Sequence, residues 1–267
     1  MENQIFNESC LDTMGRMEDN SIDLVVTSPP YDNLRTYDND VDQTWGESVW
    51  KPIIKELARV IKDGGVIVWI VNDATVDGSE TGSSFKQAIY FMECGLNLTD
   101  TMIWDKGSNG AVGNNKIYWQ SFEYMFVFSK GSPATINLIK DRKNKRVEKK
   151  NKGTKRMKDG ELIPITKGSY GDFGRRTNIW SYLTGRGHST LDVYAFEHPA
   201  TFPENLAHDH IVSWSNEGDV VYDPFLGSGT TAKMSKMTKR KYIGSEISED
   251  YFKIALKRIE ESQEYLF

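Results

Sequence analysis

The sequence has little of several features that mark particular classes of protein. Its only two cysteines, Cys10 and Cys94, are too few for a disulfide framework or a cysteine-based zinc cluster, so we expect two small buried thiols in a reducing compartment. It has no run of about 18 apolar residues, so no membrane span is predicted. Residues 1–4 lack the basic and apolar regions of a secretion signal. These absences predict a cytoplasmic protein.

The overall composition fits a globular protein of moderate size. The chain has 267 residues, of which 38% are hydrophobic, and a mean hydropathy of −0.54. This length fits one α/β domain, or one domain that carries a substantial insertion.

Positive charge is concentrated in one segment, although the whole chain has a net charge of −5. Residues 140–158 contain eleven Lys or Arg against two acidic residues, a local charge of +9, which leaves −14 on the rest of the chain. This asymmetry indicates an acidic body with a basic arm that binds a polyanion. The alternative for residues 140–160 is a solvated loop or a disordered insertion.

Hydrophobic patterns predict strands that alternate with helices. The expected strands are 5–6, 23–27, 66–71, 99–104, 124–128, 219–222 and 242–247. The expected helices are 11–17, 45–61 (ended by Asp63-Gly64-Gly65), 84–94, 202–214 (with Pro203 in its first turn), 230–237 and 248–261. The alternation predicts a mostly parallel sheet with helices on both faces. Residues 132–193 are polar and show no sustained period, so we interpret them as an inserted recognition region.

A glycine-rich motif, Asp223-Pro-Phe-Leu-Gly-Ser-Gly-Thr-Thr, follows a predicted strand and opens a predicted helix. Gly227 and Gly229 let the backbone approach a ligand, and the helix N-terminus carries partial positive charge. Glu246, at the end of the next strand, can accept the hydroxyls of a ribose. The spacing from Gly227 to Ala232 also fits a dinucleotide fingerprint, but only 38 residues follow Gly229, and an Asp-Pro has no role in binding a pyrophosphate. Glycines that serve packing alone are the other alternative.

A second motif, Ser28-Pro29-Pro30-Tyr31, follows the predicted strand 23–27. The prolines stiffen the chain and leave its carbonyls free as acceptors. If Ser28 Oγ and the Pro29 carbonyl accept the two hydrogens of an exocyclic amino group, the nitrogen lone pair can attack a methyl group in line. Tyr31 offers a flat surface on which a base can stack. A simple Pro-Pro turn is the alternative.

Taken together, the two motifs carry a resemblance to a known family. Ser-Pro-Pro-Tyr with Asp-Pro-Phe-x-Gly-Ser-Gly-Thr resembles the amino-methylating DNA methyltransferases that use S-adenosylmethionine, over residues 1–131 and 196–260. The order of the motifs resembles the beta class. This resemblance implies a seven-stranded-type methyltransferase sheet that is circularly permuted, with a catalytic half (1–131), a target-recognition insertion (132–195) and a cofactor-binding half (196–267).

The resemblance also implies which residues surround S-adenosylmethionine. His198-Pro-Ala-Thr-Phe-Pro resembles the motif that lies against the methionine part of the cofactor. Family members often have Asp before the cysteine of the N-terminal strand, whereas this chain has Ser9, so Glu8 or the Ser9 hydroxyl takes that place. The implied cofactor residues are Ser9, Phe202, Pro203, Asp223, Phe225, Gly227, Ser228, Gly229, Thr230 and Glu246.

The first residue of the catalytic motif indicates the target base. In this family Ser usually accompanies methylation of cytosine N4, whereas Asp or Asn accompanies adenine N6, so Ser28 favours cytosine N4 and leaves adenine N6 as the alternative. A catalytically silent DNA-binding protein of the same fold is a rival from another class, and RNA or protein methylation is a third possibility. The expected partner is double-stranded DNA with the base flipped out. Any restriction endonuclease must be a separate chain, and a homodimer is left open.

DNA recognition is expected from the basic insertion. Phosphate contacts are expected from Lys143, Lys145, Arg146, Lys149 and Lys150. Base reading is expected from residues 167–188, through Arg175, Arg176 and Arg186. Residues 104–106 either border the target pocket or serve packing alone. We predict no metal site, and interpret His208 and His210 as residues on a helix surface.

Overall fold

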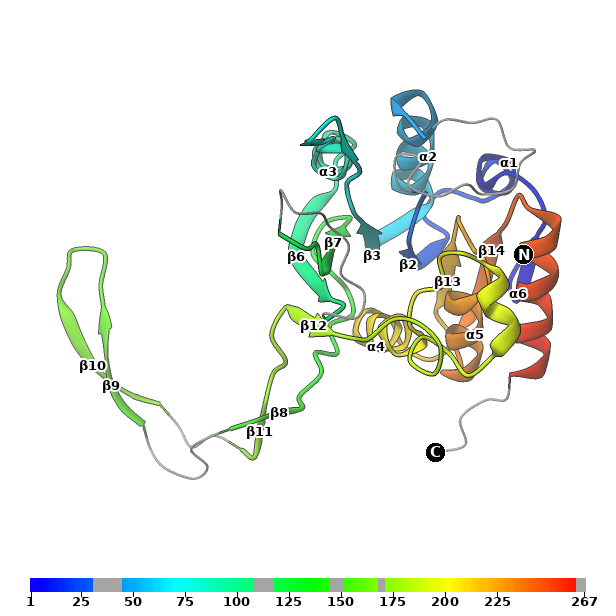
Figure 1. Cartoon of the computed structure of the whole chain (residues 1–267). Coiled ribbons are helices and arrows are strands. Elements are labelled where there is room, and N and C mark those ends of the chain that lie inside the picture. Colours follow the sequence, from blue (N-terminus) through cyan, green and yellow to red (C-terminus); the bar gives the residue numbers. More distant parts are fainter. Residues whose placement is uncertain (31–44, 108–117, 145–150, 168–170, 263–267) are drawn as a thin grey trace. The chain divides into compact units, whose positions relative to one another are not determined.

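The computed structural model describes residues 1–30, 45–107, 118–144, 151–167 and 171–262 (Figure 1). The chain divides into two compact units, a larger one made of residues 1–137 and 178–267 and a smaller one made of residues 138–177. Both sequence motifs belong to the larger unit. No helix among the described residues is long and apolar enough to span a bilayer.

An eight-stranded sheet forms the centre of the larger unit (Figure 1). In spatial order its strands are β1 (Gln4–Phe6), β14 (Lys241–Ser245), β13 (Val220–Asp223), β2 (Ile22–Thr27), β3 (Ile61–Val71), β7 (Phe122–Ser129), β6 (Asn97–Asp105) and β12 (Ile179–Ser181). Every neighbouring pair is parallel except the two that involve β7. The prediction of a mostly parallel α/β sheet is confirmed. The first strand of the chain pairs with the last, as a circular permutation requires.

Helices cover both faces of this sheet (Figure 1). On one face lie α1 (Cys10–Gly15), α2 (Glu47–Val60) and α3 (Ser83–Glu93). On the other lie α4 (Glu204–Trp214), α5 (Thr230–Met237) and α6 (Glu249–Glu261), with the short 3₁₀ helix η2 (Val193–Glu197) against α6. Helix α2 turns an apolar stripe to the sheet, which includes Ile53, Ile54 and Leu57.

The centre of the core is strand β3, in which residues 66–71 are almost completely buried. A parallel strand covered on both faces is expected to be a continuous apolar run, and Val66–Val71 is one. Trp69 packs edge-on against Phe91 of α3 and Phe225 beyond β13. The core therefore reaches directly under the glycine-rich motif.

Some element boundaries differ from the predictions for local reasons. Strand β3 begins at Ile61, directly after α2, rather than at Val66, and its first residues are irregular because Gly64 has φ +79° and the register with β2 shifts. Helix α4 begins at Glu204, so Pro203 lies at the capping position before the helix and not in its first turn. Cys10 is buried as expected, but Cys94 is only half-buried.

The region 132–193 has more regular structure than its sequence pattern predicted. Strand β12 joins the edge of the main sheet, and 178–193 belong to the larger unit. The smaller unit contains a hairpin of β9 (Asn151–Arg156) and β10 (Leu162–Lys167), and a short pair of β8 (Arg142–Lys143) and β11 (Phe173–Gly174). Another two-stranded pair, β4 (Thr75–Val76) and β5 (Ser79–Glu80), follows β3. These strands are short or polar, so none shows the apolar alternation that identifies a half-buried strand.

Candidate active site and cofactor site

The two sequence motifs lie side by side at the switch point of the sheet. Strands β2 and β13 are neighbours, yet β13 connects through α5 to β14 on one side, whereas β2 connects through α2 to β3 on the other. Ligands of open α/β sheets bind at the carboxyl ends of two such strands. Thr27 Oγ1 donates to Asp223 Oδ1 at 2.6 Å, and Thr231 Oγ1 donates to the Val26 carbonyl at 3.0 Å. These bonds join the motifs directly.

The residues of the catalytic motif begin where β2 ends. Ser28 is half-exposed, Pro29 is buried and Pro30 is half-exposed, so the motif is partly accessible on a stiff backbone. Tyr31 lies outside the described residues. The position of Ser28 next to the end of β13 fits the predicted role, which stays a prediction.

Asp223 is the most unusual carboxylate in this region. Its Oδ1 accepts hydrogen bonds from Thr27 Oγ1 and from the Phe225 backbone N–H at 3.0 Å. Its Oδ2 is buried and has no hydrogen-bond partner within the described parts of the chain. Burial raises the pKa of this carboxyl to about 6, against the lowering effect of the bond from Thr27. Asp223 therefore holds an unsatisfied acceptor that suits a cationic donor.

The glycines of the motif are required by close packing as well as by the turn. Gly227 has φ +51° and Gly229 has φ +85°, conformations that favour glycine. A Cβ on Gly227 would lie 2.9 Å from His198 Nε2, and a Cβ on Gly229 would lie 2.9 Å from the Ala255 Cα. Close packing therefore contributes to the need for glycine at both positions. The His198 ring lies against the turn.

Glu246 and Phe225 flank this turn. Glu246 Oε2 accepts the Gly227 N–H at 2.7 Å and its Oε1 accepts the Ser248 N–H at 2.9 Å. Burial raises the pKa of the Glu246 carboxyl. Each carboxylate oxygen can accept a second hydrogen bond, so the predicted contact with ribose hydroxyls remains open to it. Phe225 is half-buried and packs edge-on against Trp45 and Trp69.

The N-terminal acidic and hydroxyl residues are both engaged in local contacts. The Ser9 hydroxyl accepts the Leu11 N–H at 3.3 Å and caps helix α1. The Glu8 carboxylate accepts from Thr13 Oγ1 at 2.6 Å and pairs with Arg16, whose hydrogen bond is the main cause of its lowered pKa. Of the two residues that could take the place of the missing Asp, Ser9 is held by the weaker local contacts.

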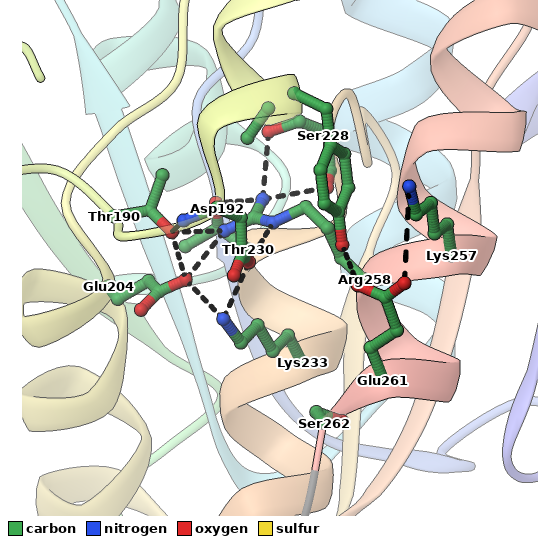
Figure 2. Close-up of polar contacts among 12 residues, drawn as sticks. Thr190, Asp192, Glu204, Ser228, Thr230, Lys233, Lys257, Arg258, Glu261 and Ser262 are labelled. Atoms are coloured by element: carbon green, nitrogen blue, oxygen red, sulfur yellow. Dashed lines mark hydrogen bonds and ion pairs between the residues drawn. The ribbon is translucent and has the colours of Figure 1, made fainter.

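A segment that starts at the end of the predicted insertion contacts the glycine-rich turn. We call residues 192–204 the strap. Its Thr201 Oγ1 lies 3.3 Å from Ser228 Oγ, and Phe202 is half-buried while Pro203 is buried. The hydroxyls of Ser228 and Thr230 also accept hydrogen bonds from Arg258 of α6, so both point into the protein (Figure 2).

Arg258 and its charged partners are functional candidates that the sequence motifs do not predict. Arg258 is almost completely buried and pairs with Asp192 and Glu204, which Lys233 also contacts (Figure 2). One signal was present in the sequence: Arg258 follows Ala255 by three residues, on the side of α6 that faces the core. A charged residue in that position indicates a buried partner.

The two histidines of helix α4 have different environments. His208 is half-exposed, and its Nδ1 lies 2.8 Å from Asp209 Oδ1. These features agree with the predicted position on the helix surface. The surface prediction is wrong for His210, which is fully buried, packs on Trp180 at 4.5 Å and contacts Met125 Sδ at 3.2 Å through Nε2. Within the described ranges, no three potential metal ligands of the His, Cys, Asp and Glu types come together.

The carboxyl end of β6 contributes charge at the same edge of the sheet. Lys106 pairs with Glu123 of the antiparallel β7 at 3.0 Å, and both side chains are nearly buried. The Trp104 indole donates to the Tyr182 carbonyl at 2.8 Å, which joins β6 to the chain after β12. A position beside the target pocket stays a prediction for these residues.

Comparison with known proteins identifies the family. Residues 22–257 match the family model N6_N4_Mtase, described as DNA methylase. The chain belongs to this family of DNA methylases. It is 56% identical over 244 residues to the orphan methyltransferase M.BamHII of Bacillus amyloliquefaciens, which covers 90% of this chain and 89% of the relative.

Solved structures share the fold of this DNA methylase. PvuII DNA methyltransferase (cytosine-N4-specific) superposes with a TM-score of 0.69 at 18% identity, over 97% of this chain and 86% of that one. The complex of M1.HpyAVI with S-adenosylmethionine superposes with a TM-score of 0.59 at 20% identity, over 96% and 98%. The predicted methyltransferase sheet is confirmed, with β12 as an additional edge strand.

The residues of this DNA methylase fit S-adenosylmethionine, the methyl donor of the family. The unsatisfied Asp223 Oδ2 suits the ammonium group of an amino acid moiety. The Glu246 carboxylate, beside the Gly227 N–H, suits ribose hydroxyls. Phe225, which is half-buried, offers an aromatic surface in the same motif. The donors and acceptors of the site therefore match the polar groups of this molecule.

The smaller unit of the DNA methylase contains some of the residues that are predicted to contact DNA. Lys143 and Arg175 are exposed, whereas Arg176 pairs with Asp141. In the hairpin β9–β10, residues 153–162 are exposed. Four of the predicted phosphate-contacting residues lie outside the described residues: Lys145, Arg146, Lys149 and Lys150. Arg186 is exposed in the larger unit.

Proposed function

We propose that this protein transfers a methyl group from S-adenosylmethionine to the exocyclic N4 of a flipped-out cytosine in duplex DNA. The observation that carries the proposal is the hydrogen bond between Thr27 and Asp223, which brings the Ser28 motif and the glycine-rich turn to one switch point. An acceptor for an amino group and a site for a nucleoside cofactor are thus adjacent.

The catalytic motif acts by positioning the target amino group. Ser28 Oγ and the Pro29 carbonyl accept its two hydrogens, which directs the nitrogen lone pair away from both oxygens. S-adenosylmethionine supplies a methyl group on a positively charged sulfur. When the nitrogen takes the methyl group, the sulfur keeps the electron pair of the broken carbon–sulfur bond and becomes a neutral thioether. The positively charged amino group then gives one proton to water, with the Ser28 hydroxyl as the relay. No charged side chain is needed as a base before the attack.

Ser28 supports cytosine as the target. The support comes from the resemblance, in which Ser at this position usually accompanies methylation of cytosine N4. The hydroxyl both donates and accepts, so it can bond an amino hydrogen and also donate to the ring nitrogen beside it, which both cytosine and adenine have. A carboxylate at this position only accepts. Adenine N6 methylation is the outcome that would change this part of the proposal.

The smaller unit supports DNA as the substrate. Its hairpin β9–β10 is a two-stranded ribbon with Lys155, Arg156 and Lys158 exposed at its end. A β-ribbon of this kind fits the major groove of B-DNA. An isolated hairpin is marginally stable in water, which favours a role in contact with a partner.

The test is nucleoside mass spectrometry of DNA methylated by the purified protein. N4-methylcytosine is expected from the unmodified protein and its loss from Ser28→Ala, with S-adenosylmethionine affinity unchanged. Ser79→Ala, an exposed serine on β5, is the matched control and keeps full activity. N6-methyladenine as the sole product would refute the target base. Tight DNA binding without any methylated nucleoside would favour the catalytically silent alternative.

A further inference from the structure

Arg258 is almost completely buried and contacts three other charged side chains beside the glycine-rich turn, of which Lys233 is buried and Asp192 and Glu204 are half-buried (Figure 2). Its Nε donates to Asp192 Oδ2 at 2.8 Å and its Nη2 donates to Glu204 Oε1 at 2.7 Å. Lys233 Nζ donates to the same two oxygens, at 2.6 and 2.7 Å. We call these four residues the Arg258 cluster; two cations and two carboxylates balance its charge.

Stability alone is a weak explanation for this cluster. Removing charged groups from water is costly, and well-packed apolar residues of similar volume often stabilise a protein as much as a buried ion pair does. Burial alone would raise the pKa of Asp192, but hydrogen bonds from Lys233 and Arg258 outweigh burial and leave it below its ordinary value. The role of Arg258 is therefore better explained by the other groups that its guanidinium contacts.

The remaining nitrogen of the guanidinium holds the glycine-rich turn. Nη1 donates to the Ser228 carbonyl at 2.7 Å, to Ser228 Oγ at 3.0 Å and to Thr230 Oγ1 at 3.1 Å. Ser228 stands between two glycines of positive φ, where the backbone has the greatest freedom to change. The planar guanidinium fixes the directions of its donors, so one side chain sets the turn relative to both carboxylates.

The same guanidinium holds both ends of the strap. Asp192 begins the strap and Glu204 ends it, and the middle of the strap contacts the turn through His198 and Thr201. Arg258 therefore bonds to the turn and to the two ends of the segment that contacts it. The resemblance places residues of both segments around the cofactor.

We propose that Arg258 is a positioning residue for S-adenosylmethionine, which holds the turn and the strap in the relative position that the cofactor requires. This inference rests on the proposed function, because it takes the glycine-rich turn as the cofactor site. It assigns Arg258 no contact with the cofactor. The competing explanation is that the cluster supports the fold through its charge balance alone.

A matched pair of variants separates the two explanations. Arg258→Met and Lys233→Met each remove one positive charge from the same cluster, but only the Arg258 side chain bonds to the turn. Arg258→Lys keeps the charge and loses the planar set of donors. The affinity for S-adenosylmethionine is measured by calorimetry on the full-length protein, with thermal unfolding recorded for each variant.

The positioning role predicts an affinity loss of about tenfold or more for Arg258→Lys and Arg258→Met, the loss expected from charge-assisted hydrogen bonds. Lys233→Met is expected to change affinity by less than about threefold at a similar loss of unfolding temperature. In the cofactor-free protein, amide hydrogen exchange in residues 227–230 is expected to rise in Arg258→Lys and not in Lys233→Met.

Two results would overturn the inference. One is an equal loss of affinity in Lys233→Met and Arg258→Met, and the other is full affinity in Arg258→Lys, which would show that charge alone is sufficient. If Arg258→Met does not fold, Arg258→Lys and the exchange measurement decide. Gly227→Ala tests the underlying site separately: unchanged cofactor affinity in that variant would refute the turn as the cofactor site, whatever Arg258 does.

Discussion

The buried carboxyl of Asp223 makes the stability of the cofactor-free protein depend on pH in a specific way. Burial raises its pKa from 3.8 to about 6, so the folded state holds a proton that the unfolded state has already lost. The stabilisation is complete below about pH 4 and is lost as the pH rises to about 6. A shift of about two pH units corresponds to on the order of 3 kcal/mol in the free energy of unfolding.

The Asp223→Asn variant reveals this contribution, because an amide keeps the Oδ1 acceptor and does not titrate. Urea unfolding of both proteins at several pH values from 4.5 to 8 is expected to show that Asp223→Asn gains stability relative to the unmodified protein as the pH rises to about 6, with a constant difference above it. Asp77→Asn is the control, because Asp77 is exposed and its φ of +51° suits Asn. A difference between Asp223→Asn and the unmodified protein that does not change with pH would refute the reasoning.

Three further predictions test other parts of the structure. Gly227→Ala places a Cβ 2.9 Å from His198 Nε2 at φ +51°, so calorimetry should show weaker S-adenosylmethionine binding and urea unfolding a loss of about 1–2 kcal/mol. Replacing the three basic residues at the hairpin end (Lys155, Arg156 and Lys158) by alanine should lower the salt dependence of DNA binding by up to about three units of slope in titrations, whereas the Lys253→Ala/Lys257→Ala control on α6 should not. Burial raises the pKa of the Cys10 thiol to about 12, so a thiol reagent should label Cys94 first and Cys10 only after unfolding; rapid labelling of Cys10 in the native protein would contradict its burial.

The sequence predicts elements well where one residue pattern decides the structure. Helix 230–237 has the predicted bounds because Gly229 fixes its start. The run 66–71 is a buried strand because all of its residues are apolar. Strand β12 could not be predicted, because a strand of three residues with one buried side chain is too short to show a hydrophobic period. It forms because β6 offers a free edge.

The polar half of the site was harder to predict than the motifs. Ser28 and Asp223 follow strands that the apolar pattern identifies, so their proximity follows from the order of the sheet. The partners of Arg258 come from residues 190–204, distant in sequence and without a pattern of their own. An arginine on an amphipathic helix is expected at the surface unless a buried partner is known.

The pairing of the first strand with the last has a consequence for how the chain folds during synthesis. Strand β3, which pairs with β2, follows it in the sequence within about 40 residues. The other neighbour of β2, strand β13, follows β2 only after about 200 residues. Until then the backbone groups of one edge of β2 are unpaired, and an unpaired apolar edge favours association with other chains. Strand β1 waits still longer, for β14. Chains shortened before residue 220 are therefore expected to aggregate, and the two sequence motifs come together only when the last strands have formed.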